Sequence, residues 1–308
     1  MMRIGQLNIW ILSTLWAVAM AGFGWYCALM GQQITYVTLA DGRRAERQIP
    51  LFFRLLLPWA PNAFPVVRRR AFEKDRARAA QRLVSAGFEG LLSDEEFVAL
   101  RLLMPLVFGS VWIGLMVLLL TTVPTPMLYK MRYALCLFGP LWFALYPVMW
   151  LRRALLTRHR SIRRALPFAL DILTLSVEAG MDFMTALQRH VERSKIDALN
   201  EELIRVLREI QLGKTRREAL RDMAARVELS DLRSVINALV QADELGVSIG
   251  SILRIQADQI RQKRFDRAER LANEAPVKML FPLMFFIFPA VFLILLGPVV
   301  VRMIQQGF

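Results

Sequence analysis

Four long stretches without a charged residue restrict this chain more than any other feature of its sequence. They cover residues 9–30, 102–121, 133–151 and 279–301 of the 308. About 20 apolar residues in a helix are needed to cross the hydrocarbon core of a bilayer, and each stretch is close to that length. Residues 9–30 exceed the apolar region of a cleaved signal peptide, which favours a retained helix. The sequence therefore predicts an all-α integral membrane protein with about four transmembrane helices.

The longest segment between these stretches contains three copies of one turn pattern. Each turn has a glycine and, two residues later, a capping residue: Gly180 with Asp182, Gly213 with Thr215, and Gly246 with Ser248. Glycine accepts the left-handed conformation that ends a helix, and Asp, Thr or Ser caps the amides that open the next one. The turns predict six helices, near 162–179, 183–194, 198–212, 216–228, 231–245 and 249–275. An ordinary helical hairpin domain has the same spacing, so the turns leave function open.

Composition divides the chain into five predicted regions. They are an N-terminal transmembrane helix (1–30), a cytoplasmic or interfacial region (31–101), two transmembrane helices (102–151), a six-helix cytoplasmic domain (152–278), and a last transmembrane helix with a short tail (279–308). Lys and Arg number twelve in 31–101 and twenty-four in 152–278, against four elsewhere. Because positive charge stays on the cytoplasmic side, both termini are predicted to lie outside the cytoplasm.

Residues 31–101 contain three local patterns. Alternation around Asp41-Gly42 predicts a β-hairpin within 34–49. Four prolines in 50–67 disfavour a straight spanning helix, so we expect this apolar segment to lie in the membrane interface. A re-entrant or fifth spanning segment is the alternative. Residues 68–101 have a helical pattern, with a stop at Gly87 and a capping box formed by Ser93 and Glu96.

Glycines and prolines in the predicted spans should affect how these helices pack and bend. Gly109 and Gly114 would permit close contact between helices in the second span. Pro140 and Pro147 should kink the third span, and Pro289 should bend the last one, because proline removes a helical hydrogen bond.

Residues 254–274 form a long charged helix that leads toward the last span. Two interpretations remain open. The helix transmits a push or rotation from a cytoplasmic partner to the membrane, or it is a solvated helix stabilised by pairs such as Asp266–Arg270.

Residue types that carry catalysis or bind metals are sparse. Cys27 and Cys136 lie in apolar stretches without metal-ligand spacing. His159 and His190 stand among arginines, so we expect both at solvated surface positions. The sequence contains no His-Glu-x-x-His run and shows no Ser-His-Asp arrangement. It therefore predicts no catalytic residue, no cofactor and no metal.

Charged motifs in the cytoplasmic domain have ordinary explanations. Gly213-Lys214-Thr215 resembles the end of a phosphate-binding loop, but Arg208 stands where that loop needs a glycine. The pairs Glu201-Glu202 and Asp243-Glu244 lie on arginine-rich helices and are predicted to be solvated. The net charge of +14 reflects cytoplasmic Lys and Arg, not nucleic-acid binding.

Several motifs, in order and at matching spacing, resemble the type II secretion F domain family. They are ALPFALDILTLSVEAGMDFMTAL (165–187), LGKTRREALRDMAARV (212–227) and QADELGVSIGSILRIQADQIRQKR (241–264). The run at 274–298 resembles in particular the TadC branch, from the tight adherence (Tad or Flp) pilus system. Besides the three turn glycines, the positions matching family motifs are Glu178, Gln256, Asp258, Arg261, Arg264, Glu269, Pro276 and Lys278.

The resemblance implies a non-enzymatic platform protein of the bacterial inner membrane, with periplasmic termini and a six-helix F domain. Implied partners are a hexameric cytoplasmic secretion ATPase, a TadB-type platform protein and pilin subunits, in a homo- or hetero-oligomer. A general type II secretion F protein is the nearer alternative. A transporter or channel subunit is an alternative of another class, and the charge-free spans disfavour an ion-coupled carrier. A lipid-modifying enzyme is the third alternative, disfavoured because no polar constellation marks a membrane face.

Overall fold

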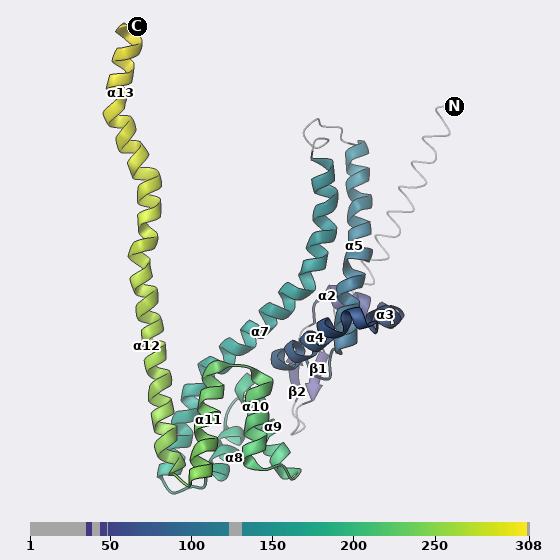
Figure 1. Cartoon of the computed structure of the whole chain (residues 1–308), viewed down its shortest axis with the longest axis vertical. Helices are drawn as coiled ribbons and strands as arrows, with labels where there is room; N and C mark the ends of the chain where they lie inside the picture. Colours follow the sequence, from purple (N-terminus) through teal and green to yellow (C-terminus); the bar gives the residue numbers. More distant parts are fainter. Residues whose placement is uncertain (1–34, 39–43, 48, 123–130, 307–308) are drawn as a thin grey trace.

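The molecule is extended and almost wholly helical, with a helical bundle at one end of three long helices (Figure 1). The computed structural model describes residues 35–38, 44–47, 49–122 and 131–306. The predicted span 9–30 with Cys27, the turn at Asp41-Gly42, and the loop near Pro124 and Pro126 lie outside the described residues. Within those residues, three helices are long and apolar enough to cross a membrane, at 94–117, 132–178 and 249–305.

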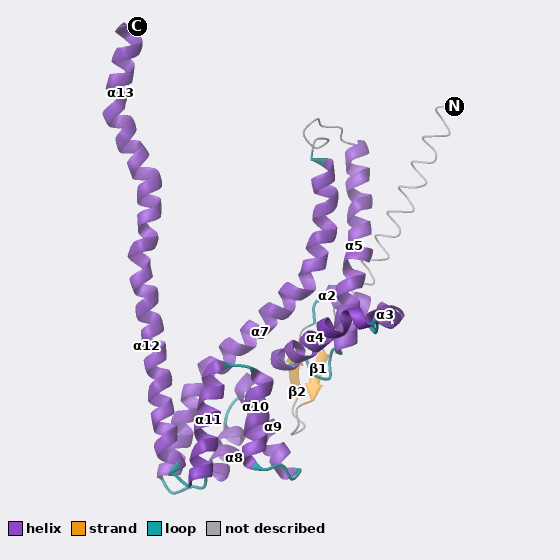
Figure 2. Ribbon diagram, viewed as in Figure 1, coloured by secondary structure: helices purple, strands orange, loops and turns teal. Residues whose placement is uncertain are grey.

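The predicted hairpin is present as two short antiparallel strands, β1 (Thr35–Thr38) and β2 (Arg44–Arg47). Thr35 pairs with Arg47 and Thr38 with Arg44. Figure 2 shows this hairpin in orange, and the other described segments are helices and loops.

The proline-containing segment forms short helices instead of one straight helix. They are α2 (Leu51–Leu56), η1 (Leu57–Trp59) and α3 (Ala60–Val67). Pro58 and Pro61 stand in the first turns of η1 and α3, where the missing N–H costs least. Phe53, Ala60 and Val67 are fully buried against the following helices.

Two helices follow before the membrane-spanning part. They are η2 (Arg70–Phe72) and α4 (Glu73–Ala86), and α4 ends at Gly87 with φ of 78°. The predicted capping box opens α5 (Asp94–Thr122), because the Ser93 amide donates to Glu96 at 2.8 Å and the Glu96 amide donates to the Ser93 hydroxyl at 3.1 Å.

Close packing joins α5 to α7 (Arg132–Glu178). A Cβ added at Gly139 would lie 2.1 Å from the Trp112 ring, and one added at Gly109 would lie 3.1 Å from Pro140. Trp112 also donates from its ring nitrogen to the Leu135 carbonyl at 2.9 Å. The contact predicted at Gly109 is therefore present, whereas Gly114 is exposed. Small residues let the two backbones approach, as in other membrane helices.

A buried cluster lies where α2, α3 and α4 meet the adjoining parts of α5 and α7. The Phe53 ring lies 4.8 Å from Trp150 and 6.4 Å from Phe97, and Phe88 lies 4.9 Å from Trp150. These aromatic contacts fix the N-terminal helices against the two long ones.

The six predicted helices of the second bundle are all present, and the four that are separate helices end within a few residues of the predicted bounds. Four are separate: α8 (Phe183–Arg193), α9 (Ala198–Gln211), α10 (Arg216–Val227) and α11 (Ser230–Leu245). The first is the end of α7, and the sixth is the beginning of α12 (Ile249–Pro282). A boundary between span and bundle was expected near 151, but no glycine or capping pattern separates 151 from 162, and the helix continues. Figure 1 shows α7 changing direction between its apolar part and the bundle.

The last span continues from α12 through a π-helical turn, η3 (Leu283–Ile287), into α13 (Phe288–Gln306). The ring of Pro289 would clash with the carbonyl of Phe285 in a regular helix, and a π turn relieves that clash. None of the most apolar 18-residue window of this helix is buried by the rest of the described chain. Figure 1 shows this part of the chain standing apart from α5 and α7.

Candidate functional site

The three turns of the helical domain have one backbone geometry. Gly180, Gly213 and Gly246 have φ of 88°, 102° and 66°. In each turn the residue after the glycine donates its amide to a carbonyl five residues earlier, as in Met181 to Ser176 at 3.0 Å. This bond satisfies a carbonyl at the end of the preceding helix, and the left-handed glycine makes it possible.

The predicted capping residues behave differently from one another. Asp182 accepts from the Met184 amide at 3.0 Å, and Thr215 forms a reciprocal capping box with Glu218. Ser248 was predicted to cap α12, but its side chain makes no capping bond. A cap that sequence reasoning missed opens α9, where Asp197 accepts from the amides of residues 199 and 200. The spacing of Asp197 before an apolar-periodic helix was the available signal.

We expect that valine at Gly180, Gly213 or Gly246 lowers the free energy of unfolding by about 1–2 kcal/mol. An added Cβ would meet no atom within 4 Å at any of the three, so the cost is conformational and not steric. Asparagine tolerates the left-handed region and should cost less. Thermal melts of paired valine and asparagine variants measure the difference. Equal melting of the two would contradict the conformational explanation.

Charged residues of the predicted motif positions form a ladder between α7 and α12. Glu178 pairs with Arg254 at 3.3 Å, and Asp171 pairs with Arg261 one helical repeat further along. Arg264 then donates to the carbonyls of residues 163 and 164 at 3.0 and 2.9 Å. Sequence reasoning identified Glu178, Arg261 and Arg264 but not their cross-helix partners. The spacing of 171 and 178 against 254 and 261, seven residues on each helix, was the available signal.

An apolar seam accompanies the ladder. Leu253, Ala257 and Ile260 of α12 are buried in the core of the bundle. A Cβ on Gly250 would lie 3.4 Å from Val177. The ladder and the seam together attach α12, which carries the last span, along the last turns of α7.

The other predicted motif positions do not join this ladder. Asp258 pairs with Arg261 at 2.9 Å within α12, Gln256 donates to Gln259 at 3.1 Å, and Lys278 pairs with Glu274 at 2.8 Å. Glu269 and Pro276 are exposed.

The pair suggested for the charged helix 254–274 differs from the one observed. The Asp266 carboxylate accepts from Gln262 at 3.0 Å, and no contact with Arg270 is found among the described residues.

A buried charge network, which sequence reasoning missed, lies between α7, α9 and α10. Arg158 is 6% exposed and pairs with Glu202 at 2.7 Å and Glu201 at 3.1 Å. Arg226 pairs with Glu202 at 3.3 Å and with Glu209 at 2.8 Å. The expectation that Glu201 and Glu202 are solvated is wrong for Glu202, which is 5% exposed, and Glu201 is only partly exposed. Arginines on two neighbouring helices face these carboxylates and compensate their burial.

The prediction that Asp243 and Glu244 are solvated is confirmed, because both residues are exposed. Asp243 pairs with Arg217 at 3.4 Å, and Glu244 pairs with Arg221 at 2.7 Å, at the surface between α10 and α11. Exposed pairs of this kind contribute little to stability.

The network extends to the N-terminal helices. Arg205 pairs with both Glu89 and Glu209, and Gln81 of α4 contacts Glu228 after α10. The Arg205 hydrogen bond lowers the pKa of the Glu89 carboxyl. These contacts attach the helical domain to the segment that packs beneath α5 and α7.

Both histidines were predicted at solvated positions, and the structure corrects this. His190 is 6% exposed, and its Nδ1 lies 3.4 Å from the Ser194 hydroxyl. His159 is half-buried, and its Nε2 lies 2.7 Å from the Val227 carbonyl. The apolar positions on either side of His190, Leu187 and Val191, carry it inward.

His190 should make the stability of the domain depend on pH. Burial lowers the pKa of its imidazole, partly opposed by the charge of Asp197. An unfolded histidine titrates at about 6.5, so below that pH the unfolded chain binds the proton more readily. Stability is therefore full above about pH 6.5 and falls as the pH drops toward the lower folded-state pKa. Melting at about pH 7.5 and about pH 5.5 should show a larger loss for the native chain than for H190Q. An equal loss would contradict this role.

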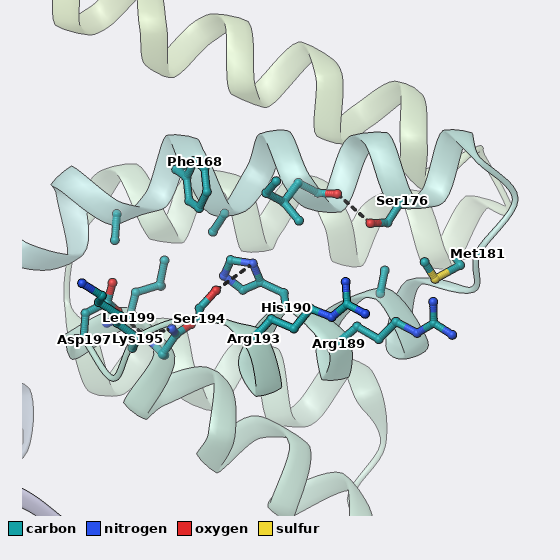
Figure 3. Close-up of a pocket in the computed structure, with 15 residues that line it drawn as sticks. Phe168, Ser176, Met181, Arg189, His190, Arg193, Ser194, Lys195, Asp197 and Leu199 are labelled. Carbon is teal, nitrogen blue, oxygen red and sulfur yellow. Dashed lines mark hydrogen bonds between the residues drawn. The ribbon is translucent and has the colours of Figure 1, made fainter.

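A pocket of about 590 Å³ lies beside His190, between α7 and the helices α8 and α9. Phe168 of α7 lies on one side, and Arg189 and Arg193 of α8 lie on the other, with the His190 ring between them (Figure 3). Phe168 is 64% exposed. Within the described part of the chain, neither arginine has an acidic partner. The pocket thus presents an apolar wall beside two arginines without ion-pair partners, and Lys195 and Asp197 also line it.

The domain that contains these features was compared with known proteins. A family model described as Type II secretion system (T2SS), protein F, matches residues 169–297. This range holds all three turns, the ladder residues from 171 onward, and the pocket residues from 169 onward. Searches of curated proteins and of solved structures found no match.

Among the described residues, no group of three or more His, Cys, Asp or Glu side chains has the arrangement of a metal site. The polar features of the domain are ion pairs and helix caps that hold helices together.

Proposed function

We propose that the chain is the inner-membrane platform protein of a Tad (Flp) pilus, on the premise that residues 169–297 match the family model of type II secretion system protein F. Platform proteins of this family are non-enzymatic membrane proteins of secretion and pilus-assembly machines. The finer assignment to a TadC-type protein rests on the resemblance of residues 274–298. A general type II secretion F protein is the alternative within the family.

The observation that carries the proposal is the attachment of two membrane helices to one helical domain. α7 runs without a break from a spanning segment into the bundle, and α12 runs from the bundle into the last span. The ladder of Asp171 and Glu178 with Arg261 and Arg254 fixes the two helices to each other. A force applied to the bundle is therefore carried to both spans, which is what coupling a cytoplasmic ATPase to pilin extraction requires.

The pocket beside His190 is our candidate contact for that ATPase. Arg189 and Arg193 lack acidic partners among the described residues, and they border an exposed apolar wall that includes Phe168. A partner surface with carboxylates around an apolar side chain would complement both features.

The proposal includes an orientation of the chain in the membrane. Figure 1 shows the C-terminal end of α5, the N-terminal end of α7 and the C-terminal end of α13 on the side away from the bundle. With the arginine-rich bundle in the cytoplasm, these ends would be periplasmic. A TadB-type protein would then complete the platform within the membrane.

Photo-crosslinking in living cells that assemble the machine tests the proposal. A photoreactive residue at Arg193 or Arg217 should capture the secretion ATPase or a TadB-type protein, and one at Phe286, in the last span, should capture pilin. Cells that lack the ATPase are the control for the first adduct. Adducts with a general secretion ATPase would favour the alternative within the family. Efficient labelling without any of these adducts would contradict the platform function.

A further inference from the structure

A second pocket, of about 570 Å³, lies where α4 passes the ends of the apolar parts of α5 and α7. Each of the three helices contributes arginine to it: Arg78 and Arg82 from α4, Arg101 from α5, and Arg152 from α7. Figure 1 shows α4 lying across the direction of α5 at this level. This pocket is separate from the proposed ATPase contact beside His190.

The pocket lies at the level where the membrane meets water, and two helices place it there independently. On α5, Arg101 is the last charged residue before the apolar run 102–121. On α7, Arg152 is the first charged residue after the apolar run 133–151. Both arginines line the pocket. Its mouth is therefore at the depth of lipid headgroups.

The pocket has an excess of positive charge. Asp75 is its acidic lining residue and pairs with Arg101 at 3.7 Å. Arg78, Arg82 and Arg152 are exposed and form no ion pair with the part of the chain that the structure describes. This differs from the ladder between α7 and α12, where Arg254 and Arg261 are each paired with a carboxylate. Three arginines that line one pocket without an ion-pair partner favour a bound anion, and guanidinium geometry suits phosphate.

Apolar side chains line the membrane side of the pocket. Val148 and Leu151 precede Arg152 on α7 and lie toward its apolar run, whereas Phe97 of α5 and Leu155 and Leu156 of α7 line the side away from the membrane. A ligand that extends from the arginines toward the membrane would meet the apolar side chains of Val148 and Leu151. A phospholipid has this polarity, with a charged phosphate joined to acyl chains.

We propose that this pocket binds the phosphate headgroup of an anionic phospholipid from the cytoplasmic leaflet. Arg78, Arg82 and Arg152 hold the headgroup, and the first methylenes of an acyl chain lie against Val148. A bound lipid of this kind ties α4 to α5 and α7 at the membrane surface. Basic pockets between membrane helices on the cytoplasmic side are suited to such headgroups.

Lipid binding to the full-length chain tests the proposal. The detergent-solubilised protein is titrated with phosphatidylglycerol or phosphatidylcholine, and bound lipid is counted by native mass spectrometry. R82Q/R152Q removes two pocket arginines, and K74Q/R153Q is the matched control, because it removes the same charge from exposed positions on the same two helices outside the pocket. We expect phosphatidylglycerol affinity to fall about fivefold per pocket arginine, on the order of 25-fold for both, and to change less than about twofold in the control.

Three results would overturn the proposal. Equal losses in the two double variants would mean that total charge, and not the pocket, attracts the lipid. Equal binding of phosphatidylcholine and phosphatidylglycerol by the native chain would remove the requirement for an anion. Displacement of the lipid by soluble glycerol phosphate at similar concentrations would indicate a site for a free phosphate compound. R82Q alone repeats the test if the double variant does not fold.

Discussion

Methionine at Arg158 is expected to lower the free energy of unfolding of the helical domain by about 3 kcal/mol. Arg158 is buried and pairs with both Glu201 and Glu202. Methionine fills similar space but leaves the carboxylate of Glu202, itself 5% exposed, with less positive charge around it. Removing one partner of a buried ion pair is costly because the remaining charge stays out of water. Guanidinium unfolding of the full-length protein in detergent, followed by circular dichroism, measures the change.

Two further variants make this prediction specific. R160M makes the same substitution at an exposed position half a turn away and should change stability by less than about 0.5 kcal/mol. R158M/E202L removes the pair together, and Arg226 keeps Glu209 at 2.8 Å, so part of the loss should be recovered. If the double variant lost the sum of the single losses, the buried pair would not be coupled and the explanation would fail.

Alanine at Leu253 should cost a similar amount, on the order of 3 kcal/mol. Leu253 lies on α12, is fully buried, and packs into the core formed by α7 and the shorter helices. Truncation removes apolar contacts and leaves a cavity in a close-packed interior. The same unfolding measurement applies. Because Leu253 anchors the helix that carries the last span, the proposed platform function predicts that pilus assembly falls together with stability.

Ile255 provides the matched control for Leu253. It lies two residues further along the same helix and is 50% exposed, so I255A should change stability by less than about 1 kcal/mol. Equal losses for L253A and I255A would show that α12 does not pack through the Leu253 face.

The turns and helices were predictable because their signals are local. Gly180, Gly213 and Gly246 end helices through their own backbone freedom, and the apolar positions between them repeat at helical spacing. The continuity of α7 was missed because charge composition marked a boundary near Arg152, and composition does not break a helix. Glycine and proline can break a helix because they change its backbone geometry or hydrogen bonding. Even so, Pro167 lies within α7 without ending it.

The site was less predictable because its contacts join distant parts of the chain. Glu178 and Arg261 were identified through family motifs, yet their partners lie more than 70 residues away in sequence. His190 and Glu202 were expected in solvent because most such residues are solvated, and only the packing of α7 against α8 and α9 buries them. Charge burial of this kind depends on tertiary neighbours and has no local signature.

The π turn at Leu283–Ile287 changes the rotational phase of the last span. A π turn adds one residue to a helix, and each residue of an α-helix corresponds to a rotation of about 100° and a rise of about 1.5 Å. Arg254 and Arg261 lie on the face of α12 that contacts α7. Because of the inserted residue, this face is not in line with the same face of α13. The π turn therefore sets the face that the last span offers inside the membrane separately from the way α12 is held in the helical bundle.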